Sequence, residues 1–378
     1  MHPSHGGCYG EGGGQLKGKV AALVGSAEVA VKEFEVPEPE PGAVLAKVRR
    51  ANVCGSEVHI YHFRHPLIRE CVLGHEFVGE VLALGEGVTT DYAGNPVEVG
   101  DRVIAPYFLT CRRCQACLRG DFNLCQKAYT FWSKPPEDDP HFHGAFATHY
   151  YVHPEQYFYK VPDSVPDNTV AGANCGLSQV LFGLHQTGLS TGDSLLIQGA
   201  GGLGLYAAAV GRDMGARVIV VEGIRQRIEL ARRFGAEEIV DMKEYPEAGD
   251  RVRQVQSLTD GYGADVVLEV SGVPAAFVEA LHLVRPGGRV IEIGNVSVGK
   301  EHEVSLAPGL ITRKMIRVQG FVRYQPWYLH KAMGFLERKH EDHPFDELTD
   351  EEYALKDVGK AIERAEAKIV ARPAVVPA

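Results

Sequence analysis

The sequence predicts an α/β fold in which a doubly wound parallel sheet accompanies a second, β-rich domain. The length of 378 residues is enough for about two domains with separate cores. Between about 170 and 320, short apolar runs alternate with helical patterns, which is the order typical of a parallel sheet. Before that stretch, short β segments follow one another with proline and glycine between them. Together these observations favour two domains of different construction.

The expected elements follow this division in chain order. In the first domain, residues 18–168, we expect strands near 20–24, 29–31, 44–48, 72–73, 77–84 and 102–105. In the second, residues 169–322, we expect six strands near 195–197, 217–221, 238–240, 265–270, 289–293 and 316–321. The helices expected between them include 203–214 and 225–234. The remainder, 323–378, predicts a helix with Leu355, Val358 and Ile362 on one face, then a strand near 369–370, and we expect it to complete the first domain.

Composition limits the classes of partner. The net charge of −10 disfavours non-specific binding to nucleic acid or to an anionic membrane. No apolar run approaches the roughly 20 residues that a membrane-spanning helix needs. The first 17 residues are rich in glycine and histidine, so we expect a disordered tail without a secretory signal, and a cytoplasmic protein.

A glycine motif, Gly199-Ala-Gly201-Gly202-Leu203-Gly204, follows one expected strand and opens the next helix. That context is typical of a Rossmann dinucleotide site, although a simple packing turn is the alternative. The first glycine allows a tight turn, the second allows the backbone to approach a pyrophosphate, and the last allows close packing of helix on strand. The helix N-terminus would then bind the phosphates.

Glu222 ends the next expected strand, 23 residues after the first glycine of the motif. A carboxylate there can accept hydrogen bonds from the ribose hydroxyls of NAD and would repel the 2′-phosphate of NADP. Arg225 and Arg227 oppose this interpretation, because a nearby arginine can accommodate that phosphate. We therefore expect NAD, with NADP as the less favoured alternative, and count Arg227 among the cofactor contacts.

The cysteines fall into two groups. Four of the eight, Cys111, Cys114, Cys117 and Cys125, lie within fifteen residues, a spacing that predicts one tetrahedral structural zinc with no open position. Two disulfides, as in an extracellular protein, or four free thiols are the alternatives. The other group is dispersed: Cys54, His75 and Cys175 each have an ordinary structural interpretation when taken singly.

In its motifs the chain resembles the zinc-containing alcohol dehydrogenases of the medium-chain dehydrogenase/reductase superfamily. The resemblance rests on Gly74-His75-Glu76-x2-Gly79-x5-Gly85-x2-Val88, on Cys54-Gly-Ser-Glu-Val-His59, on Asn174-Cys175-Gly176 and on the two motifs above, in the order of that family. It extends over about residues 18–378. It implies a GroES-like catalytic domain over 18–168, completed by 323–378, and a Rossmann NAD-binding domain over 169–322.

The resemblance also implies a catalytic zinc held by Cys54, His75 and Cys175, with the fourth position open, and thus two zinc ions per chain. Glu76 would lie beside this metal as a further carboxylate. Glu57 stands where the family usually has aspartate and would orient the histidine ligand.

The implied reaction is reversible hydride transfer between an alcohol and NAD, through a zinc-bound alkoxide, with an aldehyde or ketone as the product. Ser56 would accept the alcohol proton and His59 would pass it towards solvent. A turn hydroxyl and a surface histidine are the respective alternatives. By the same resemblance, Gln179, Ile293 and Phe321 would lie near the nicotinamide, and a homodimer or homotetramer is expected.

Three questions stay open on the sequence. Phe131, Trp132 and Phe142 either line an apolar substrate pocket or form a packing cluster of their own. A catalytically silent NAD-binding scaffold is one rival function, although it predicts the loss of metal ligands or of Ser56. A zinc-free enone or quinone reductase of the same superfamily is the other, against which the two cysteine groups argue.

Overall fold

The computed structural model describes residues 16–349, 351–367 and 372–377. The tail expected at the N-terminus, up to residue 15, and the strand expected near 369–370 lie outside the described residues. The chain divides into two compact units, the first over Met1–Cys175, Gln325–His340 and Phe345–Ala378 and the second over Gly176–Tyr324 and Glu341–Pro344. None of the described helices is long and apolar enough to cross a membrane.

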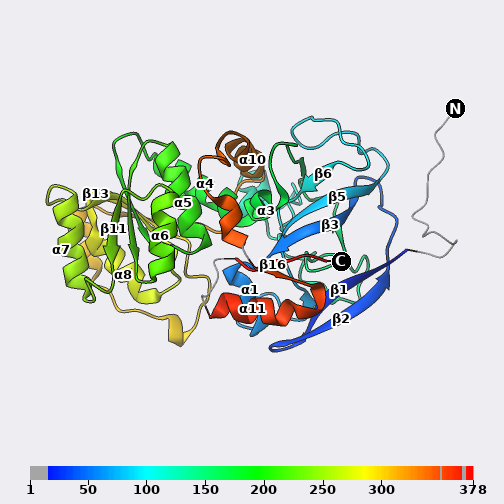
Figure 1. Ribbon diagram of the computed structural model, residues 1–378, viewed down its shortest axis with the longest axis horizontal. Helices are drawn as coiled ribbons and strands as arrows, with labels where there is room; N and C mark the ends of the chain where they lie inside the picture. Colours follow the sequence, from blue (N-terminus) through cyan, green and yellow to red (C-terminus); the bar gives the residue numbers. More distant parts are fainter. Residues whose placement is uncertain (1–15, 350, 368–371, 378) are drawn as a thin grey trace. The chain divides into compact units, whose positions relative to one another are not determined.

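The second unit contains a parallel sheet whose strand order is β11-β10-β9-β12-β13-β14 (Figure 1). Each of the six predicted strands is present: β9 (Ser194–Gln198), β10 (Arg217–Glu222), β11 (Glu238–Asp241), β12 (Ala264–Glu269), β13 (Val284–Glu292) and β14 (Arg317–Gly320). Its helices are α4 (Ser178–Thr187), α5 (Gly202–Asp213), α6 (Arg225–Arg233), α7 (Ala248–Leu258), α8 (Pro274–Leu283) and α9 (Pro308–Lys314), with the short η3 (Lys300–His302).

This order is the doubly wound one. From β9 the chain adds β10 and then β11 on one side of the sheet, and it then returns to add β12, β13 and β14 on the other side. The central strand β9 is buried along its whole length, as a strand covered by helices on both faces must be. The switch point falls between β9 and β12, so the loops after these strands meet at one edge of the sheet. The predicted fold class is therefore present in this unit.

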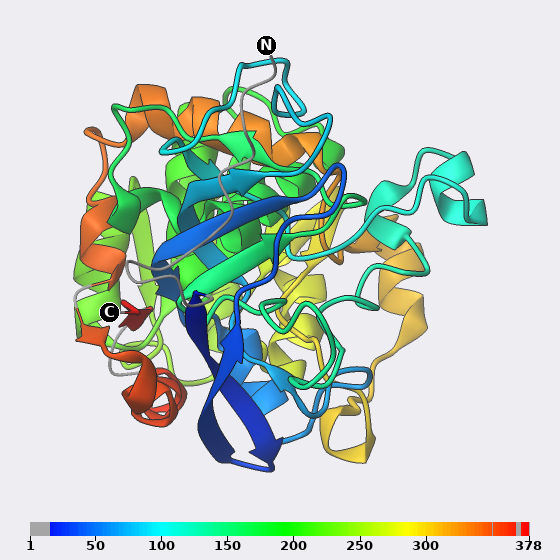
Figure 2. The same cartoon turned by 90° about the vertical axis from the view of Figure 1, so that its right-hand side faces the viewer.

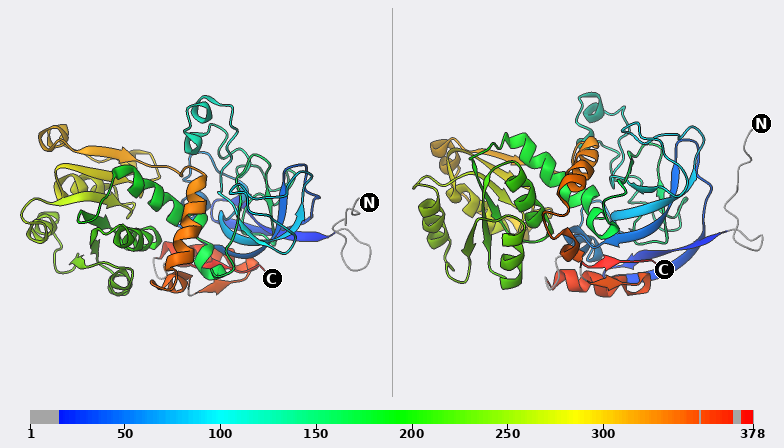
Figure 3. Two further views of the ribbon diagram at one scale, coloured as in Figure 1. Left: turned by 90° about the horizontal axis from the view of Figure 1, so that it is seen from above. Right: turned by 45° about the horizontal axis from the view of Figure 1, so that its top comes forward.

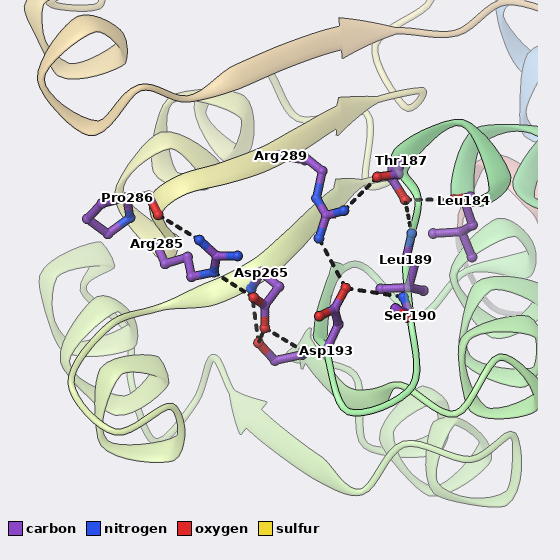
Figure 4. A network of polar contacts seen from close by, with 10 residues as sticks. Leu184, Thr187, Leu189, Ser190, Asp193, Asp265, Arg285, Pro286 and Arg289 are labelled. Carbon is purple, nitrogen blue, oxygen red and sulfur yellow. Dashed lines mark hydrogen bonds and ion pairs between the residues drawn. The ribbon is translucent and has the colours of Figure 1, made fainter.

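Two polar networks fix the opposite end of the same sheet (Figure 4). The guanidinium of Arg289 donates to the carbonyl of Thr187 at 2.6 Å and to Asp193 at 3.1 Å. Asp265 accepts from Ser194 and from Arg285. Burial would raise the pKa of Asp265, but the Ser194 and Arg285 hydrogen bonds outweigh it and the pKa is lowered. These bonds tie β9, β12 and β13 together far from their carboxyl ends.

The strands of the first unit pair antiparallel, except for β15 and β16, which are parallel. One sheet has the order β2-β1-β4, and a larger one has the order β15-β16-β3-β5-β6-β8, with β7 paired to β3. The strands are β1 (Lys17–Gly25), β2 (Glu28–Glu35), β3 (Val44–Asn52), β4 (Cys71–Val72), β5 (Glu76–Leu84), β6 (Arg102–Ile104), β7 (His149–Val152), β8 (Tyr159–Lys160), β15 (Glu352–Tyr353) and β16 (Ala374–Val375). The predicted strands near 20–24 and 29–31 are the two arms of one hairpin.

Short helices close this unit. They are α1 (Gly55–Tyr61), α2 (Gln115–Leu118), α3 (Asp167–Val170), α10 (Trp327–Lys339) and α11 (Val358–Glu366), with the turns η1 (Phe122–Leu124), η4 (Phe345–Thr349) and η5 (Leu355–Asp357). Leu355, Val358 and Ile362 are buried in one cluster with residues of β3 and β5, as predicted. The helix itself begins only at Val358, and Leu355 lies in the preceding turn η5. The C-terminal segment thus completes the β-rich unit, and β16 pairs directly with β3.

Candidate catalytic metal centre and dinucleotide site

Three of the predicted metal ligands reach one point of the first unit from three different elements. Cys54 follows β3 and precedes the first turn of α1. His75 immediately precedes β5. Cys175 lies in the π-helical turn η2 (Ala173–Leu177), and such irregular turns are frequent at functional sites. The structure therefore brings together side chains that are up to 121 residues apart in the chain.

The donor atoms lie at distances suited to one shared metal ion. The Sγ atoms of Cys54 and Cys175 are 3.9 Å apart, and Nε2 of His75 is 3.2 Å from Sγ of Cys175. Together with a carboxylate oxygen of Glu76, all of these atoms lie within 4.8 Å of one another, and all four residues are buried. Two cysteines and a histidine are the donor set of catalytic zinc sites that keep one position for substrate. The residues present therefore fit zinc.

Glu57 holds the histidine in place from the other side. Its carboxylate accepts a hydrogen bond from Nδ1 of His75 and another, at 2.8 Å, from the backbone N–H of Cys54. Burial alone would lower the pKa of His75, but the charges of Glu57 and Cys54 outweigh burial and raise it. The hydrogen bond with Cys175 holds the pKa of Cys54 well below its usual range. This glutamate therefore turns Nε2 of His75 towards the two sulfur atoms.

Glu76 has a partner that the sequence did not reveal. Both of its oxygens accept from Nη1 of Arg372, in the C-terminal segment, and both side chains are almost fully buried. Burial raises the pKa of Glu76 to about 8, although Arg372 opposes the shift. Asn174 braces the same place, because its Nδ2 donates to the carbonyls of His75 (2.7 Å) and Ala105 (2.8 Å). No sequence signal links Arg372 to a residue 296 positions earlier.

Gly74 is required by the backbone before His75. Its φ is +88°, in the left-handed region, and a Cβ there would lie 2.5 Å from the backbone nitrogen of Phe146. Any side chain at this position would push the histidine-bearing turn away from its neighbour.

The two residues predicted as a proton relay lie on α1. Ser56 and His59 are three positions apart, so they occupy neighbouring places on one helix face, and both are partly exposed. They follow Cys54 directly, which places them beside the candidate metal centre in the chain. Their role in proton transfer remains a prediction.

Aromatic rings surround His75. The ring centroids of Tyr107 and Trp132 lie 4.8 Å and 4.9 Å from that of His75. The indole N–H of Trp132 donates to the carbonyl of Val72 at 3.2 Å, which fixes the ring. Phe131 and Phe142 instead belong to a separate apolar cluster with residues of β1 and β3. Of the three aromatic residues considered for a substrate pocket, only Trp132 lies beside the metal ligands; the other two are packing residues.

The four clustered cysteines form a lobe around α2 and η1 that projects from the β-rich unit (Figure 2). The sulfur atoms of Cys111, Cys114, Cys117 and Cys125 all lie within 4.8 Å of one another. Backbone N–H groups of Cys111 and Lys127 point at Sγ of Cys125, at 3.3 and 3.4 Å. All seven cysteines in the described part of the chain are free thiols, so the disulfide alternative does not hold there. Four converging sulfur donors fit a closed structural zinc site.

The glycine loop of the second unit has the shape that its sequence predicts. Gly199 has a φ of +99°, and a Cβ on Gly204 would lie 1.9 Å from the carbonyl oxygen of Gly199, so α5 can approach β9 only with glycine there. Gly201 precedes the first turn of α5, which begins at Gly202 and Leu203. The amino end of a twelve-residue helix is thus presented at the carboxyl edge of the sheet, where a diphosphate can bind.

Glu222 lies against this loop at the end of β10. One carboxylate oxygen accepts from the backbone N–H of Ala200 at 2.9 Å, and the other accepts from Gly223 and Ile224. Arg225 is exposed and forms an ion pair with Glu229. Nη1 of Arg227 lies 4.0 Å from where a Cβ of Gly201 would be, beside the glycine loop. Of the two arginines, Arg227 is thus the one that approaches the predicted phosphate position.

Three further predicted contacts gather on the same unit. Nε2 of Gln179 donates to the carbonyl of Phe321 at 3.1 Å. A Cβ on Gly183 would contact the side chains of both Ile293 and Phe321, so these residues meet over α4. The structure brings Gln179, Ile293 and Phe321 together, although their contact with a nicotinamide ring stays a prediction.

Comparison with known proteins supports this assembly of sites. Residues 40–163 match the alcohol dehydrogenase GroES-like domain, and residues 202–338 match the zinc-binding dehydrogenase domain. A sorbitol dehydrogenase of Bacillus subtilis is 31% identical over 359 residues, which are 92% of this chain and 93% of that protein. The chain belongs to the zinc-binding dehydrogenase family. This dehydrogenase is therefore an oxidoreductase of the class that acts on CH–OH groups.

Other relatives of this dehydrogenase differ in what their names say they act on. A 5-exo-hydroxycamphor dehydrogenase of Pseudomonas putida is 31% identical over 91% of the chain and 95% of its own length. An L-threonine 3-dehydrogenase of Pyrococcus horikoshii is 37% identical over 69% of the chain and 71% of its own length. Among solved structures, an alcohol dehydrogenase of Thermotoga maritima has a TM-score of 0.89 at 26% identity and covers 96% of this chain and 100% of its own. The predicted Rossmann and GroES-like architecture is thus confirmed.

Proposed function

We propose that the protein is a zinc- and NAD-dependent alcohol dehydrogenase that interconverts an alcohol with its aldehyde or ketone. The observation that carries the proposal is the buried convergence of Cys54, His75 and Cys175. The fourth candidate donor, Glu76, is paired with Arg372, so these three donors leave one ligand position for substrate. The four-cysteine lobe, by contrast, supplies a complete set of ligands. The presence of the three donors argues against both a silent scaffold and a zinc-free reductase.

Zinc held by these three residues supplies a Lewis acid that makes an alcohol more acidic. The nicotinamide of a bound dinucleotide supplies the hydride acceptor. The chain's own residues then orient and deprotonate the substrate. Glu57 keeps Nε2 of His75 directed at the sulfur atoms. Oγ of Ser56 accepts the hydroxyl proton while its own proton passes to the imidazole of His59, which releases a proton to solvent.

We propose an apolar alcohol as substrate, in preference to a polyol. The rings of Tyr107 and Trp132 contact His75, so two aromatic side chains lie beside the metal ligands. An apolar carbon skeleton can replace water against such rings at little cost, whereas the hydroxyl groups of a polyol would need hydrogen-bond partners there.

We propose NAD as the dinucleotide. The Glu222 carboxylate lies at the glycine loop, where it can accept hydrogen bonds from a ribose and would repel a 2′-phosphate. A zinc-binding dehydrogenase of Sinorhizobium meliloti, 26% identical with a TM-score of 0.82, is bound to NADP, so NADP is the alternative to test. The position of Arg227 beside the loop is the feature that NADP binding would use.

We propose a homo-oligomer in which a second copy covers β14. This strand ends the sheet order of the second unit, all four of its residues are exposed, and Figure 3 shows it at the edge. Val318 on the strand and Met315 before it are exposed apolar side chains, and an exposed strand edge favours pairing with another chain. Light scattering of the purified protein tests this, and Gln319→Pro should shift the mass towards the monomer.

The proposed reaction is tested with a panel of primary, secondary, cyclic and aromatic alcohols and of polyols, with NAD and with NADP. Turnover that prefers NAD and apolar alcohols supports the proposal. Preference for a polyol would overturn the substrate class, and faster turnover with NADP would show that Arg227 outweighs Glu222.

A further inference from the structure

Two acidic side chains lie next to each other at the carboxyl edge of the second unit's sheet. Glu269 is the last residue of β12, Glu292 is the last residue of β13, and the two are register partners. Residues paired across parallel strands project from the same face. Glu269 is fully buried, and Glu292 is mostly buried.

Hydrogen bonds tie both carboxyl groups to the turns that follow the strands. Oε1 of Glu269 accepts from the backbone N–H groups of Ser271 (2.7 Å) and Gly272 (3.2 Å), and from the Ser271 hydroxyl. The amide of Asn295 bridges the pair, since its Nδ2 donates to Oε2 of Glu269 at 3.1 Å and to Oε1 of Glu292 at 3.2 Å. The amide group of Asn295 therefore donates to both carboxyl groups.

The pair has no cation beside it in the described residues. The neighbouring strands present uncharged residues at this level, Gln198 from β9 and Gly320 from β14, and the following turns present Ser271 and Asn295. Oε2 of Glu292 is buried without a hydrogen-bond partner among the described atoms. A proton shared between the two carboxyl groups would supply the missing donor.

Electrostatics favours that shared proton. Burial, with the charge of Glu292 adding to it, raises the pKa of Glu269 to about 8. Two carboxylates in one buried site do not both ionise readily, because each charge opposes the other and both lose solvation. At neutral pH Glu269 therefore favours its protonated form.

The pair also lies directly behind the glycine loop. The turn that Glu269 holds packs on this loop, since a Cβ on Gly199 would be 3.1 Å from the Cα of Ser271. Gly294 leaves room for the acid, because a Cβ there would be 2.4 Å from Oε2 of Glu269. A movement of either carboxyl group would thus displace backbone that contacts the first glycine of the dinucleotide motif.

We propose that Glu269 and Glu292 share one proton, that the protonated pair positions the Ser271–Gly272 turn against the glycine loop, and that the dinucleotide therefore binds most tightly while this proton is retained. The two acids are positioning residues that act through the loop. The inference rests on the dinucleotide site of the proposed function and adds a proton to its binding equilibrium.

The sign of the effect follows from linkage. Loss of the proton places a second negative charge behind a loop that must bind an anionic diphosphate, and it loosens the turn. Affinity therefore falls as the pH rises through the pKa of Glu269, and binding in that range takes up a proton. With full coupling, affinity falls about tenfold for each pH unit above that pKa.

The test is titration calorimetry of the zinc-loaded protein with ADP-ribose, which contains the diphosphate but no nicotinamide. Affinity is measured from pH 6.5 to 9.5, and proton uptake is obtained near pH 8.5 from buffers of different ionisation enthalpy. We expect about a tenfold loss of affinity between pH 7 and 9 for the unaltered protein, with uptake of up to one proton. Glu269→Gln keeps a hydrogen-bonding amide but removes the buried acid whose pKa is raised, so its affinity should vary less than about twofold over that range.

Two further variants complete the design. Glu292→Gln removes the charge that adds to burial, so it should lower the pKa of Glu269 and move the fall in affinity to lower pH. Glu244→Gln, at an exposed carboxyl group of the same unit, should keep the profile of the unaltered protein.

The outcomes separate the two proposals. If the unaltered protein binds ADP-ribose without proton uptake, if Glu269→Gln keeps the full pH dependence, or if Glu292→Gln leaves the profile at the same pH, the shared proton is excluded while the dinucleotide site stands. If ADP-ribose does not bind at any pH, the proposed dinucleotide site is wrong.

Discussion

Glu57 and His75 form a buried hydrogen-bonded pair, in which Nδ1 of the histidine donates to the glutamate carboxylate. The same carboxylate accepts from the backbone N–H of Cys54 at 2.8 Å. One side chain thus fixes the ring of one candidate zinc ligand and the backbone of another. The geometry shows that glutamate can take this position, where the resemblance led us to expect aspartate.

Removing that carboxylate should weaken the metal site without unfolding the chain. Glu57→Gln keeps the shape but loses the charge, and changes of this kind beside a metal ligand typically cost about 10- to 100-fold in metal affinity. Competition with a chromogenic chelator measures the zinc affinity. Glu70→Gln, at an exposed carboxyl group of the same unit, is the control and should leave it unchanged. Equal affinities for the two variants would show that Glu57 does not support His75.

Arg372 should be important for stability. Arg372→Ala leaves Glu76 buried without its partner, and breaking a buried ion pair in this way costs about 3–5 kcal/mol in the free energy of unfolding. The matched control is Arg212→Ala in the exposed Arg212–Glu237 pair, which should cost less than about 1 kcal/mol. Urea unfolding at fixed zinc concentration compares them. A similar small loss in both variants would contradict the structural role of Arg372.

Dinucleotide preference should depend on Glu222. Glu222→Ala removes a charged acceptor and its repulsion of a 2′-phosphate, so kcat/KM with NAD should fall by about 10- to 100-fold while the value with NADP rises. Steady-state kinetics with both dinucleotides provides the ratio of kcat/KM with NAD to kcat/KM with NADP. Glu244→Ala serves as the control, and an unchanged ratio in Glu222→Ala would disprove the assignment of this residue to dinucleotide selection.

The two cysteine groups should hold one zinc ion each. Cys114→Ser and Cys54→Ser are each expected to reduce the metal content from two to one per chain, as measured by mass spectrometry of the desalted protein. Only Cys54→Ser should abolish turnover at equal folded concentration, because the lobe is not expected to touch substrate. Retention of two metal ions in Cys114→Ser would rule out the structural site.

The stability of the second unit should respond to alkaline pH through the Glu269–Glu292 pair. Because burial raises the pKa of Glu269 to about 8, the folded protein keeps a proton that the unfolded chain releases above its ordinary pKa near 4.5. The contribution of this group to the free energy of unfolding is therefore fully present below about pH 4.5 and falls as pH rises towards 8. Glu292→Gln should remove part of that fall. If the free energy of unfolding changes with pH in the same way in Glu292→Gln and in the unaltered protein, this contribution of the pair is contradicted.

Periodicity and motif spacing were sufficient for much of this fold. The six strands of the second unit are short apolar runs with helices between them, and the glycine loop lies at the predicted junction of β9 and α5. Clustered ligands could also be found, because the four cysteines of the lobe are local in sequence. The dispersed ligands Cys54 and Cys175 needed the family resemblance.

Contacts between distant segments were not predictable from the chain. The Arg372–Glu76 pair joins residues 296 positions apart, and nothing in the local pattern distinguishes this arginine. The Glu269–Glu292 pair depends on strand order and register, which sequence periodicity does not contain. Likewise, Phe131 and Phe142 differ from Trp132 only in which cluster they enter, and that depends on tertiary packing.

The central claim is that alcohol oxidation takes place at the centre formed by Cys54, His75 and Cys175. The most direct measurement is NAD reduction by the zinc-replete protein with its best alcohol, compared with Cys175→Ser under the same conditions. We predict turnover in the unaltered protein, loss on treatment with a chelator, recovery on addition of zinc, and no turnover in the variant. Undiminished NAD reduction by Cys175→Ser would contradict the account.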